Sequence, residues 1–135
     1  MNEHTCTFSR RERVKSKKLT DSLFKGGNSR SMAVYPVRMV YEEKERGDHD
    51  EPVVTLMSVS KRHFRRAVKR NRVKRQLREA YRSRKRILLS RMPQDKAYVV
   101  AFIWMADELA DSATVGDCME RLLTRLAEKN YTRGE

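Results

Sequence analysis

The sequence has no long apolar run and little cysteine. No stretch reaches the roughly 18 apolar residues that a membrane helix needs, and the N-terminal residues MNEHTCTFSRRERVK show no continuous apolar stretch after their charges. We therefore expect neither a membrane span nor a secretion signal. The two cysteines, Cys6 and Cys118, are far apart and lack CxxC spacing, which suggests neither a disulfide framework nor a zinc site. We expect a reduced, cytoplasmic setting and no metal site on the protein.

Acidic residues are almost missing from the middle of the chain. Residues 61–91 contain 15 of the 31 Lys and Arg residues but only one acid, Glu79, which gives a net charge of +14. The flanking segments are nearly neutral, with net charges of +2 for residues 1–60 and −3 for residues 92–135. Because neighbouring guanidinium groups repel each other, charge this dense indicates that a polyanion neutralises it in use. Nucleic acid is the first candidate.

The length of 135 residues fits one domain, in which we expect residues 1–10 to form a flexible arm and residues 129–135 a flexible tail. Hydrophobic periodicity predicts an alternation of helices and strands. The predicted elements are a helix at 11–25 that ends at Gly26 and Gly27, a strand at 34–41 with Tyr35, Val37, Met39 and Tyr41 on one face, a charged connector at 42–52, a buried strand at 53–59, a basic helix at 66–88, a central strand at 97–104, and a last helix capped by Asp111 or Ser112, with Val115, Cys118, Met119, Leu122, Leu123 and Leu126 as its apolar repeat.

The predicted basic helix has an apolar side and a cationic side. On a helical wheel, one side gathers Val73, Leu77, Ala80, Tyr81, Ile87 and Leu88. The opposite arc carries Asn71, Lys74, Arg75, Arg78, Arg82, Lys85 and Arg86, whereas Arg66, Lys69 and Arg70 project toward the apolar sector. Such a helix can pack on a sheet and offer an unbroken cationic ridge to phosphate groups. A helix with charges of both signs usually indicates only a solvent-exposed surface. Here a single Glu offers few opposite charges to relieve the repulsion among the Lys and Arg side chains.

The stretch SVSKRHFRRAVKRNRVKRQLREAYR, residues 58–82, resembles the signature of the bacterial ribonuclease P protein component. The matching positions are Ser60 and Lys61, Ala67 and Val68, Arg70, Asn71 and Arg72, Lys74 and Arg75, Arg78 and Glu79, and Tyr81 and Arg82. Two places depart from the family pattern. The spacer RHFRR lacks the glycine that many members carry and is one residue longer, and Thr20 replaces the first of two aromatics in the first helix, of which Phe24 keeps the second.

This resemblance implies an α/β (α+β two-layer) fold with an approximately four-stranded, mostly antiparallel sheet, three helices and a left-handed βαβ crossover through the basic helix, against the usual right-handed preference. It also implies that the protein is a non-catalytic, monomeric subunit of an endoribonuclease that matures tRNA 5′ ends, with Mg²⁺ held mainly by the RNA. The implied contacts with the catalytic RNA subunit are Lys61, Arg62, Arg66, Lys69, Arg70, Asn71, Arg72, Lys74, Arg75, Arg78 and Arg82. The expected contacts with the single-stranded leader of precursor tRNA are Lys17, Phe24 and Tyr35.

Two other functions remain open from the residues alone. A protein-only nuclease needs carboxylates that converge on divalent ions, but the acids lie mainly in the predicted connector or near Asp107, Glu108 and Asp111, and His4, His49 and His63 lack metal-ligand spacing. A generic RNA-binding or ribosome-assembly protein would share the charge. The Arg-Asn-Arg core within an amphipathic helix favours the ribonuclease P interpretation.

Overall fold

The computed structural model describes residues 29–47 and 51–133, which form one four-stranded sheet and three helices. In chain order the elements are β1 (Arg30–Val34), β2 (Val37–Glu45), β3 (Val53–Val59), α2 (Ala67–Arg84), α3 (Arg86–Leu89), β4 (Lys96–Trp104) and α4 (Ser112–Arg133). The predicted fold class is confirmed. The predicted helix at 11–25, the arm at 1–10 and the site residues Lys17 and Phe24 lie outside the described residues.

The sheet has the strand order β1-β2-β4-β3. β2 pairs antiparallel with both β1 and β4, whereas β3 and β4 are parallel, so the sheet is mostly antiparallel, as predicted. β4 has a strand on each side and is buried from Ala97 to Phe102, which confirms the central strand. α2 and α3 form the crossover between the parallel strands β3 and β4. The left-handed sense of this crossover stays a prediction.

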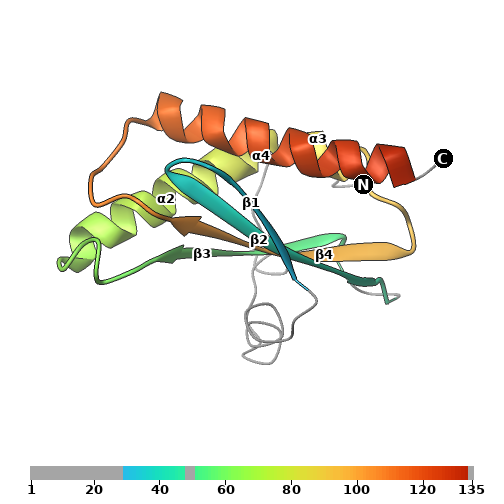
Figure 1. The fold of residues 1–135 in the computed structure, drawn as a ribbon, viewed down its shortest axis with the longest axis horizontal. Coiled ribbons are helices and arrows are strands. Elements are labelled where there is room, and N and C mark those ends of the chain that lie inside the picture. Colours follow the sequence, from blue (N-terminus) through green and yellow to red (C-terminus); the bar gives the residue numbers. More distant parts are fainter. Residues whose placement is uncertain (1–28, 48–50, 134–135) are drawn as a thin grey trace.

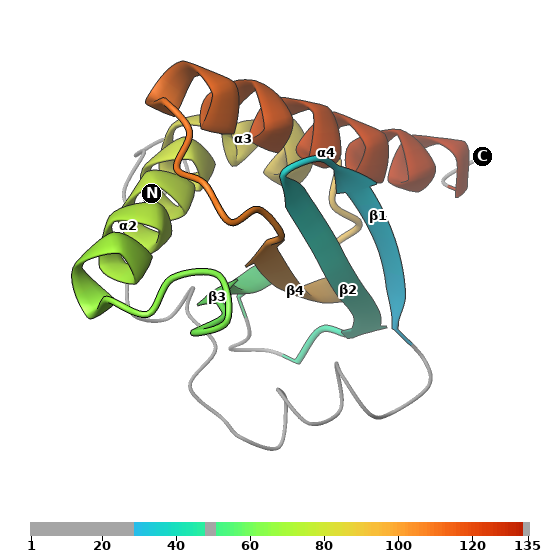
Figure 2. The same cartoon turned by 60° about the vertical axis from the view of Figure 1, so that its left-hand side comes forward.

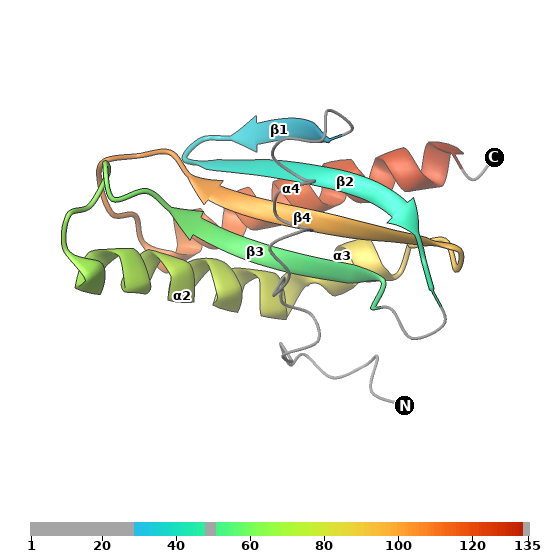
Figure 3. The same ribbon diagram turned by 90° about the horizontal axis from the view of Figure 1, so that it is seen from below.

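The three described helices lie on one side of the sheet (Figure 1). α4 covers β1 and β2, and α2 runs alongside β3 (Figures 2 and 3). The main core lies between these two layers, where Met39, Phe102, Leu77 and Leu122 are all fully buried. Alternate strand positions face this core because successive side chains in a strand point to opposite faces.

The predicted strand over residues 34–41 is confirmed from Val37 onward, but its start is wrong. β1 ends at Val34, Tyr35 and Pro36 form a turn with a cis peptide bond between them, and β2 starts at Val37. Val34 and Val37 pair directly across this turn. Pro36 has no backbone N–H to donate to a ladder, so it is suited to a turn and not to the interior of a strand.

The strand β2 also extends beyond the predicted boundary. Val37, Met39 and Tyr41 face the core as expected, but pairing with β4 continues to Glu45. The first part of the predicted charged connector is therefore a strand, in which Glu42, Glu43 and Lys44 are partly exposed and Glu45 is exposed. A connector inferred from charge alone missed this extension, because the pairing partner lies far away in the sequence.

The predicted continuous basic helix is divided into α2 and α3. α2 ends at Arg84, α3 starts at Arg86, and the backbone N–H groups of Leu88 and Leu89 donate to the Lys85 carbonyl at 3.1 and 2.9 Å. Lys85 is only 5% exposed, so its predicted place on the outward arc is wrong. The helical wheel assumed one continuous helix with a constant rotation per residue through residue 88, whereas α2 ends at Arg84 and a separate short helix follows.

The last helix starts at the predicted cap. Asp111 Oδ1 accepts a hydrogen bond from the Thr114 backbone N–H at 2.8 Å, as an N-cap side chain does. The predicted apolar repeat from Val115 to Leu126 is buried. α4 continues to Arg133, so residues 129–133 are helical where we predicted a flexible tail. Among the helices that the structure describes, none is long and apolar enough to cross a membrane.

Replacing Asp111 with alanine should destabilise the protein, and more so at neutral than at acidic pH. Hydrogen bonds from Thr114, first from its side chain and then from its backbone, hold the pKa of the Asp111 carboxyl below its usual value. A carboxyl whose pKa is lowered by folding contributes stability above its ordinary pKa of 3.8, and this contribution is lost as pH falls through the folded-state pKa. Urea unfolding of the wild type and of Asp111→Ala, at neutral pH and at a pH below 3.8, measures the difference in their free energies of unfolding.

Asp111→Asn is the matched control, because asparagine keeps the oxygen acceptor and is also a good N-cap. It should lose less stability at neutral pH than Asp111→Ala does. If the difference in free energy of unfolding between wild type and Asp111→Ala stays constant on acidification, the assigned role of the ionised carboxylate is wrong.

Candidate nucleic-acid interface

α2 turns one side toward the rest of the protein. Its buried residues are Val73, Leu77, Ala80 and Tyr81. Tyr81 packs against Phe102 of β4 with ring centroids 5.9 Å apart, and Gln76 Nε2 donates to the Ala110 carbonyl at 3.0 Å. These contacts fix the rotation of α2 about its own axis, and the remaining side therefore faces solvent.

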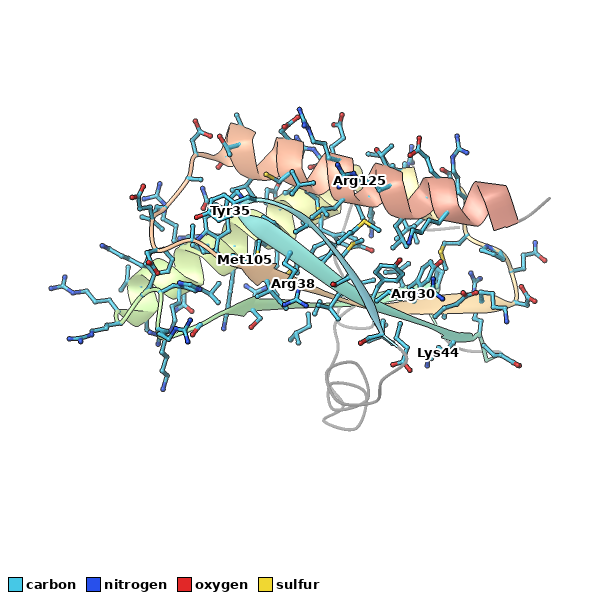
Figure 4. The ribbon with its side chains drawn as sticks, viewed as in Figure 1. Arg30, Tyr35, Arg38, Lys44, Met105 and Arg125 are labelled. Carbon is cyan, nitrogen blue, oxygen red and sulfur yellow. The ribbon has the colours of Figure 1, made fainter. Side chains whose placement is uncertain are left out.

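The solvent-facing side of α2 and the turn before it carry the cations. Among the predicted RNA contacts, the exposed residues are Lys61, Arg62, Arg66, Lys69, Asn71, Arg72 and Arg75, and the partly exposed ones are Arg70, Lys74, Arg78 and Arg82. The first turn of α2 contains no acid and no side-chain cap. Figure 4 shows nitrogen-tipped side chains projecting into solvent around the start of this helix. We call this surface the α2 cationic face.

Glu79, the one acid of residues 61–91, is paired within α2. Arg82 Nε donates to Glu79 Oε2 at 3.0 Å, and Arg82 Nη2 also contacts Oε1. The hydrogen bond and positive charge of Arg82 hold the pKa of Glu79 below its usual value, so Glu79 is ionised at neutral pH. Because Glu79 offsets the charge of Arg82, the exposed Arg72 and Arg75 are the stronger candidates for contact with phosphate.

Arg70 has a local partner that sequence reasoning did not identify. Its Nη1 donates to the backbone carbonyls of Phe64 and Arg65 at 2.8 and 2.7 Å. This guanidinium therefore holds the end of the β3–α2 turn in place. A loss of RNA binding on removal of Arg70 would include the effect of a loosened turn, which makes Arg70 a poor probe of direct phosphate contact.

Arg84 is directed toward α4. Its guanidinium lies over Gly116, with Nη2 only 2.5 Å from the position that a Cβ there would occupy. Its Nε is 3.7 Å from Oε1 of Glu120. A larger residue at position 116 would displace this guanidinium, which is the flexible end of the Arg84 side chain. Arg84 joins the two helices and is not part of the α2 cationic face.

Tyr35 is the one predicted leader contact that the structure describes. The residue is 70% exposed, at the tip of the β1–β2 turn (Figure 4). It lines an open pocket of about 320 Å³ together with Trp104, Asp107 and Glu108. The two acids oppose the binding of a phosphate inside this pocket, so only the solvent-facing part of the Tyr35 ring is suited to stack on a base.

The sheet face opposite the helices carries a second, smaller apolar cluster. Its members are Val40, Val54, Leu56, Val99, Ala101 and Ile103. Arg38 is exposed and pairs with Ile103 in the β2–β4 register, so both side chains point to this face. Figure 4 labels Arg38 on the strand next to the Tyr35 turn. Val40, Val99 and Ala101 are buried, so the apolar surface that a single strand of nucleic acid could contact beside Arg38 is limited to the partly exposed Val54, Leu56 and Ile103.

The acids show no arrangement of a hydrolytic metal centre within residues 29–47 and 51–133, where no cluster of possible metal ligands occurs. Glu42, Glu43 and Glu45 lie on β2 and not on a loop, which corrects the predicted connector. Asp107 binds His63 through its Oδ1, 2.6 Å from Nδ1.

Sequence reasoning missed two exposed cations, Arg65 and Arg38. Arg65 lies in the spacer RHFRR, between Arg62 and Arg66 that were predicted, and it is equally exposed. The local charge density was signal enough to include it. Arg38 lies in a predicted strand with apolar neighbours, and only the register of β2 with β4 places it beside the second apolar cluster.

Comparison with known proteins gives a consistent result. The family model described as Ribonuclease P matches residues 8–127. Two proteins named ribonuclease P protein component, from two strains of Porphyromonas gingivalis, are each 39% identical to this chain, over 126 and 125 residues. Each alignment covers 91% of this chain and 88% of the relative.

Solved structures have the same fold. The ribonuclease P protein of Thermotoga maritima superposes with a TM-score of 0.64 at 22% identity, covering 84% of this chain and 96% of that one. The Staphylococcus aureus protein gives a TM-score of 0.61 at 20% identity, covering 84% and 94%. At 20–22% identity the structural likeness shows the fold alone. The family relationship is shown by the sequence matches. On the strength of these matches, this chain belongs to the ribonuclease P protein family.

Proposed function

We propose that this protein binds the catalytic RNA of ribonuclease P through the α2 cationic face and contacts the 5′ leader of precursor tRNA through a separate surface. Family membership makes the chain a subunit of an endoribonuclease holoenzyme that processes tRNA, with ribonuclease P RNA as its partner. The assignment of surfaces, the contact with precursor tRNA and the absence of catalysis by the protein itself are our proposal.

The α2 cationic face carries the first part of this proposal. Arg72 and Arg75 are exposed because a buried stripe fixes the opposite side of the helix, and the one acid of the helix is already paired with Arg82. A folded ribozyme and its tRNA substrate are both polyanions, so their association is opposed by charge repulsion. A cation-rich protein screens that repulsion and releases counterions from the RNA.

The second part of the proposal concerns the leader strand. An unpaired strand is bound without much base preference when aromatic rings stack on its bases and cations accompany its backbone. Phe24, Lys17 and Tyr35 are the residues that we propose for this role. Arg38 and the partly exposed members of the second apolar cluster, Val54, Leu56 and Ile103, would add a further contact surface. The Mg²⁺ that the holoenzyme requires is, in this proposal, bound mainly by the RNA.

The alternative is an RNA-binding protein of the same family fold without a role in cleavage. A reconstitution experiment separates the two. The protein is mixed with a bacterial ribonuclease P RNA and precursor tRNA at a low Mg²⁺ concentration, and 5′ maturation is followed by gel. We expect cleavage to be stimulated, because the protein screens the repulsion that Mg²⁺ otherwise has to screen. Protein without RNA should produce no cleavage, and cleavage by rigorously RNA-free protein would overturn the proposal.

Removing one phosphate-contacting arginine should change the salt dependence of RNA binding. We expect Arg75→Ala to weaken binding to ribonuclease P RNA and to reduce the slope of log K against log salt by about one unit. Filter binding at several salt concentrations measures both quantities. Arg125→Ala is the matched control, because Arg125 is exposed on α4 and away from the α2 cationic face (Figure 4). An equal change of slope in both variants would contradict the assigned surface.

The proposed leader contact predicts a selective defect. Phe24→Ala should lower the affinity of the holoenzyme for precursor tRNA by about 1–3 kcal/mol, the usual contribution of a base stacked on an aromatic ring. Affinity for mature tRNA, which has no leader, should change much less. Competition binding with the two tRNAs measures the ratio. If Phe24→Ala weakens both tRNAs equally, Phe24 has a structural role and the leader assignment is wrong.

A further inference from the structure

The β3–α2 turn, residues 60–66, is a cationic surface in its own right. It contains the longer, glycine-free spacer RHFRR, and Lys61, Arg62, Arg65 and Arg66 are all exposed on it. Four cations on a turn do not share the regular spacing of a helix, so the conformation of the turn decides where their charges lie. What holds the turn therefore matters for any phosphate that it binds.

Both ends of this turn are held by contacts of its own. At its start, Ser60 Oγ accepts from the Arg62 backbone N–H at 3.0 Å, and the Ser60 carbonyl accepts from the His63 N–H at 3.1 Å. At its end, Phe64 is buried with 5% exposure, and Arg70 donates to the Phe64 and Arg65 carbonyls. The turn is thus anchored to β3 on one side and to α2 on the other.

The middle of the turn is held by a different part of the chain. His63 Nδ1 lies 2.6 Å from Oδ1 of Asp107, which belongs to the connector between β4 and α4. Because β3 and β4 are parallel and Val59 pairs with Trp104, both segments leave the sheet at the same end. The carboxylate accepts, so Nδ1 carries the hydrogen, whether the ring is neutral or protonated. The His63 side chain is 20% exposed and that of Asp107 is 80% exposed.

We propose that His63 and Asp107 are a positioning pair that orients the β3–α2 turn, so that its four cations meet phosphate groups of the partner RNA. This inference rests on the proposed function, because it takes ribonuclease P RNA as the ligand of the turn. The pair acts through Lys61, Arg62, Arg65 and Arg66 and contacts no phosphate itself.

The two effects of Asp107 on RNA binding have opposite signs, which makes the proposal testable. As a negative charge beside cations, Asp107 opposes the approach of RNA, so its removal should strengthen binding if charge alone mattered. As the acceptor for His63, it orders the turn, so its removal should weaken binding. Asparagine keeps an oxygen acceptor but loses the charge, whereas alanine loses both.

The experiment compares binding of full-length variants to a bacterial ribonuclease P RNA over a range of salt concentrations. We expect Asp107→Ala to bind about two- to fivefold more weakly than wild type, the size that a largely exposed ion pair supports. Its slope of log K against log salt should fall by about one unit, because the disordered turn makes fewer phosphate contacts. Asp107→Asn should bind at least as tightly as wild type, with the wild-type slope.

His63→Ala loses the same contact but keeps the negative charge of Asp107, so it should bind somewhat more weakly than Asp107→Ala. The double variant should be no weaker than His63→Ala, since both substitutions remove one interaction. Glu108→Ala is the charge control, because Glu108 is the neighbouring exposed acid whose contact in the fold is a backbone one, from Trp104 Nε1 to its carbonyl. Its removal should strengthen binding slightly. Thermal unfolding of each variant identifies any general loss of structure. If Asp107→Ala shows such a loss, RNA binding by Asp107→Asn still tests the proposal, because asparagine keeps the oxygen acceptor.

Tighter or unchanged binding of Asp107→Ala, or additive losses from the two single variants, would overturn the positioning role. The failure of the proposed function has a different signature. Wild-type protein would then bind ribonuclease P RNA no better than a duplex RNA of equal length, and this comparison is made before any variant is tested.

Discussion

Burial of one stripe of α2 is the contact on which the rest of this structure depends. A helix with a single acid among its cations is weakened by charge repulsion, at about 0.2–0.5 kcal/mol for each like-charged pair one turn apart. Full burial of a Val or Leu side chain contributes about 1.5–3 kcal/mol, and Val73, Leu77 and Tyr81 are all completely buried. A few packed side chains therefore outweigh the repulsion along the exposed side. The same contacts fix which side is exposed, so packing and function are set by one stripe.

The cations of this segment are divided between two tasks. Arg70 binds backbone carbonyls, Arg84 lies against Gly116 of α4, and Lys85 is buried at the break between α2 and α3. These residues stabilise the protein and its turns. The exposed ones, Arg72 and Arg75 among them, are available to a polyanion. Charge counted along the sequence overestimates the binding surface, because a buried or hydrogen-bonded cation contributes little to contact with phosphate.

Parallel pairing of β3 with β4 gives the sheet its functional end. It brings the β3–α2 turn and the β4–α4 connector together, although His63 and Asp107 are 44 positions apart in the chain. The hairpin turn at Tyr35 and Pro36 lies at this end too, with the Met105 backbone N–H donating to the Pro36 carbonyl at 2.9 Å. Three connections thus lie at the same end of the sheet. The family resemblance carried by residues 58–82 and the geometry of this end concern the same part of the protein.

The sequence by itself determined the elements whose signal is local. The largely apolar stretch VVTLMSV, the eight-residue apolar run AYVVAFIW and the three-and-four repeat of the last helix each occur within one segment, and the structure has β3, β4 and α4 there. The motif around Arg70, Asn71 and Arg72 identified the family in the same way. Tertiary structure alone decided the β1–β2 hairpin, the extension of β2 to Glu45 and the burial of Lys85. It also decided the pairing of His63 with Asp107 and the place of Arg38, because strand register and side-chain contacts between distant segments exist only once the chain has folded.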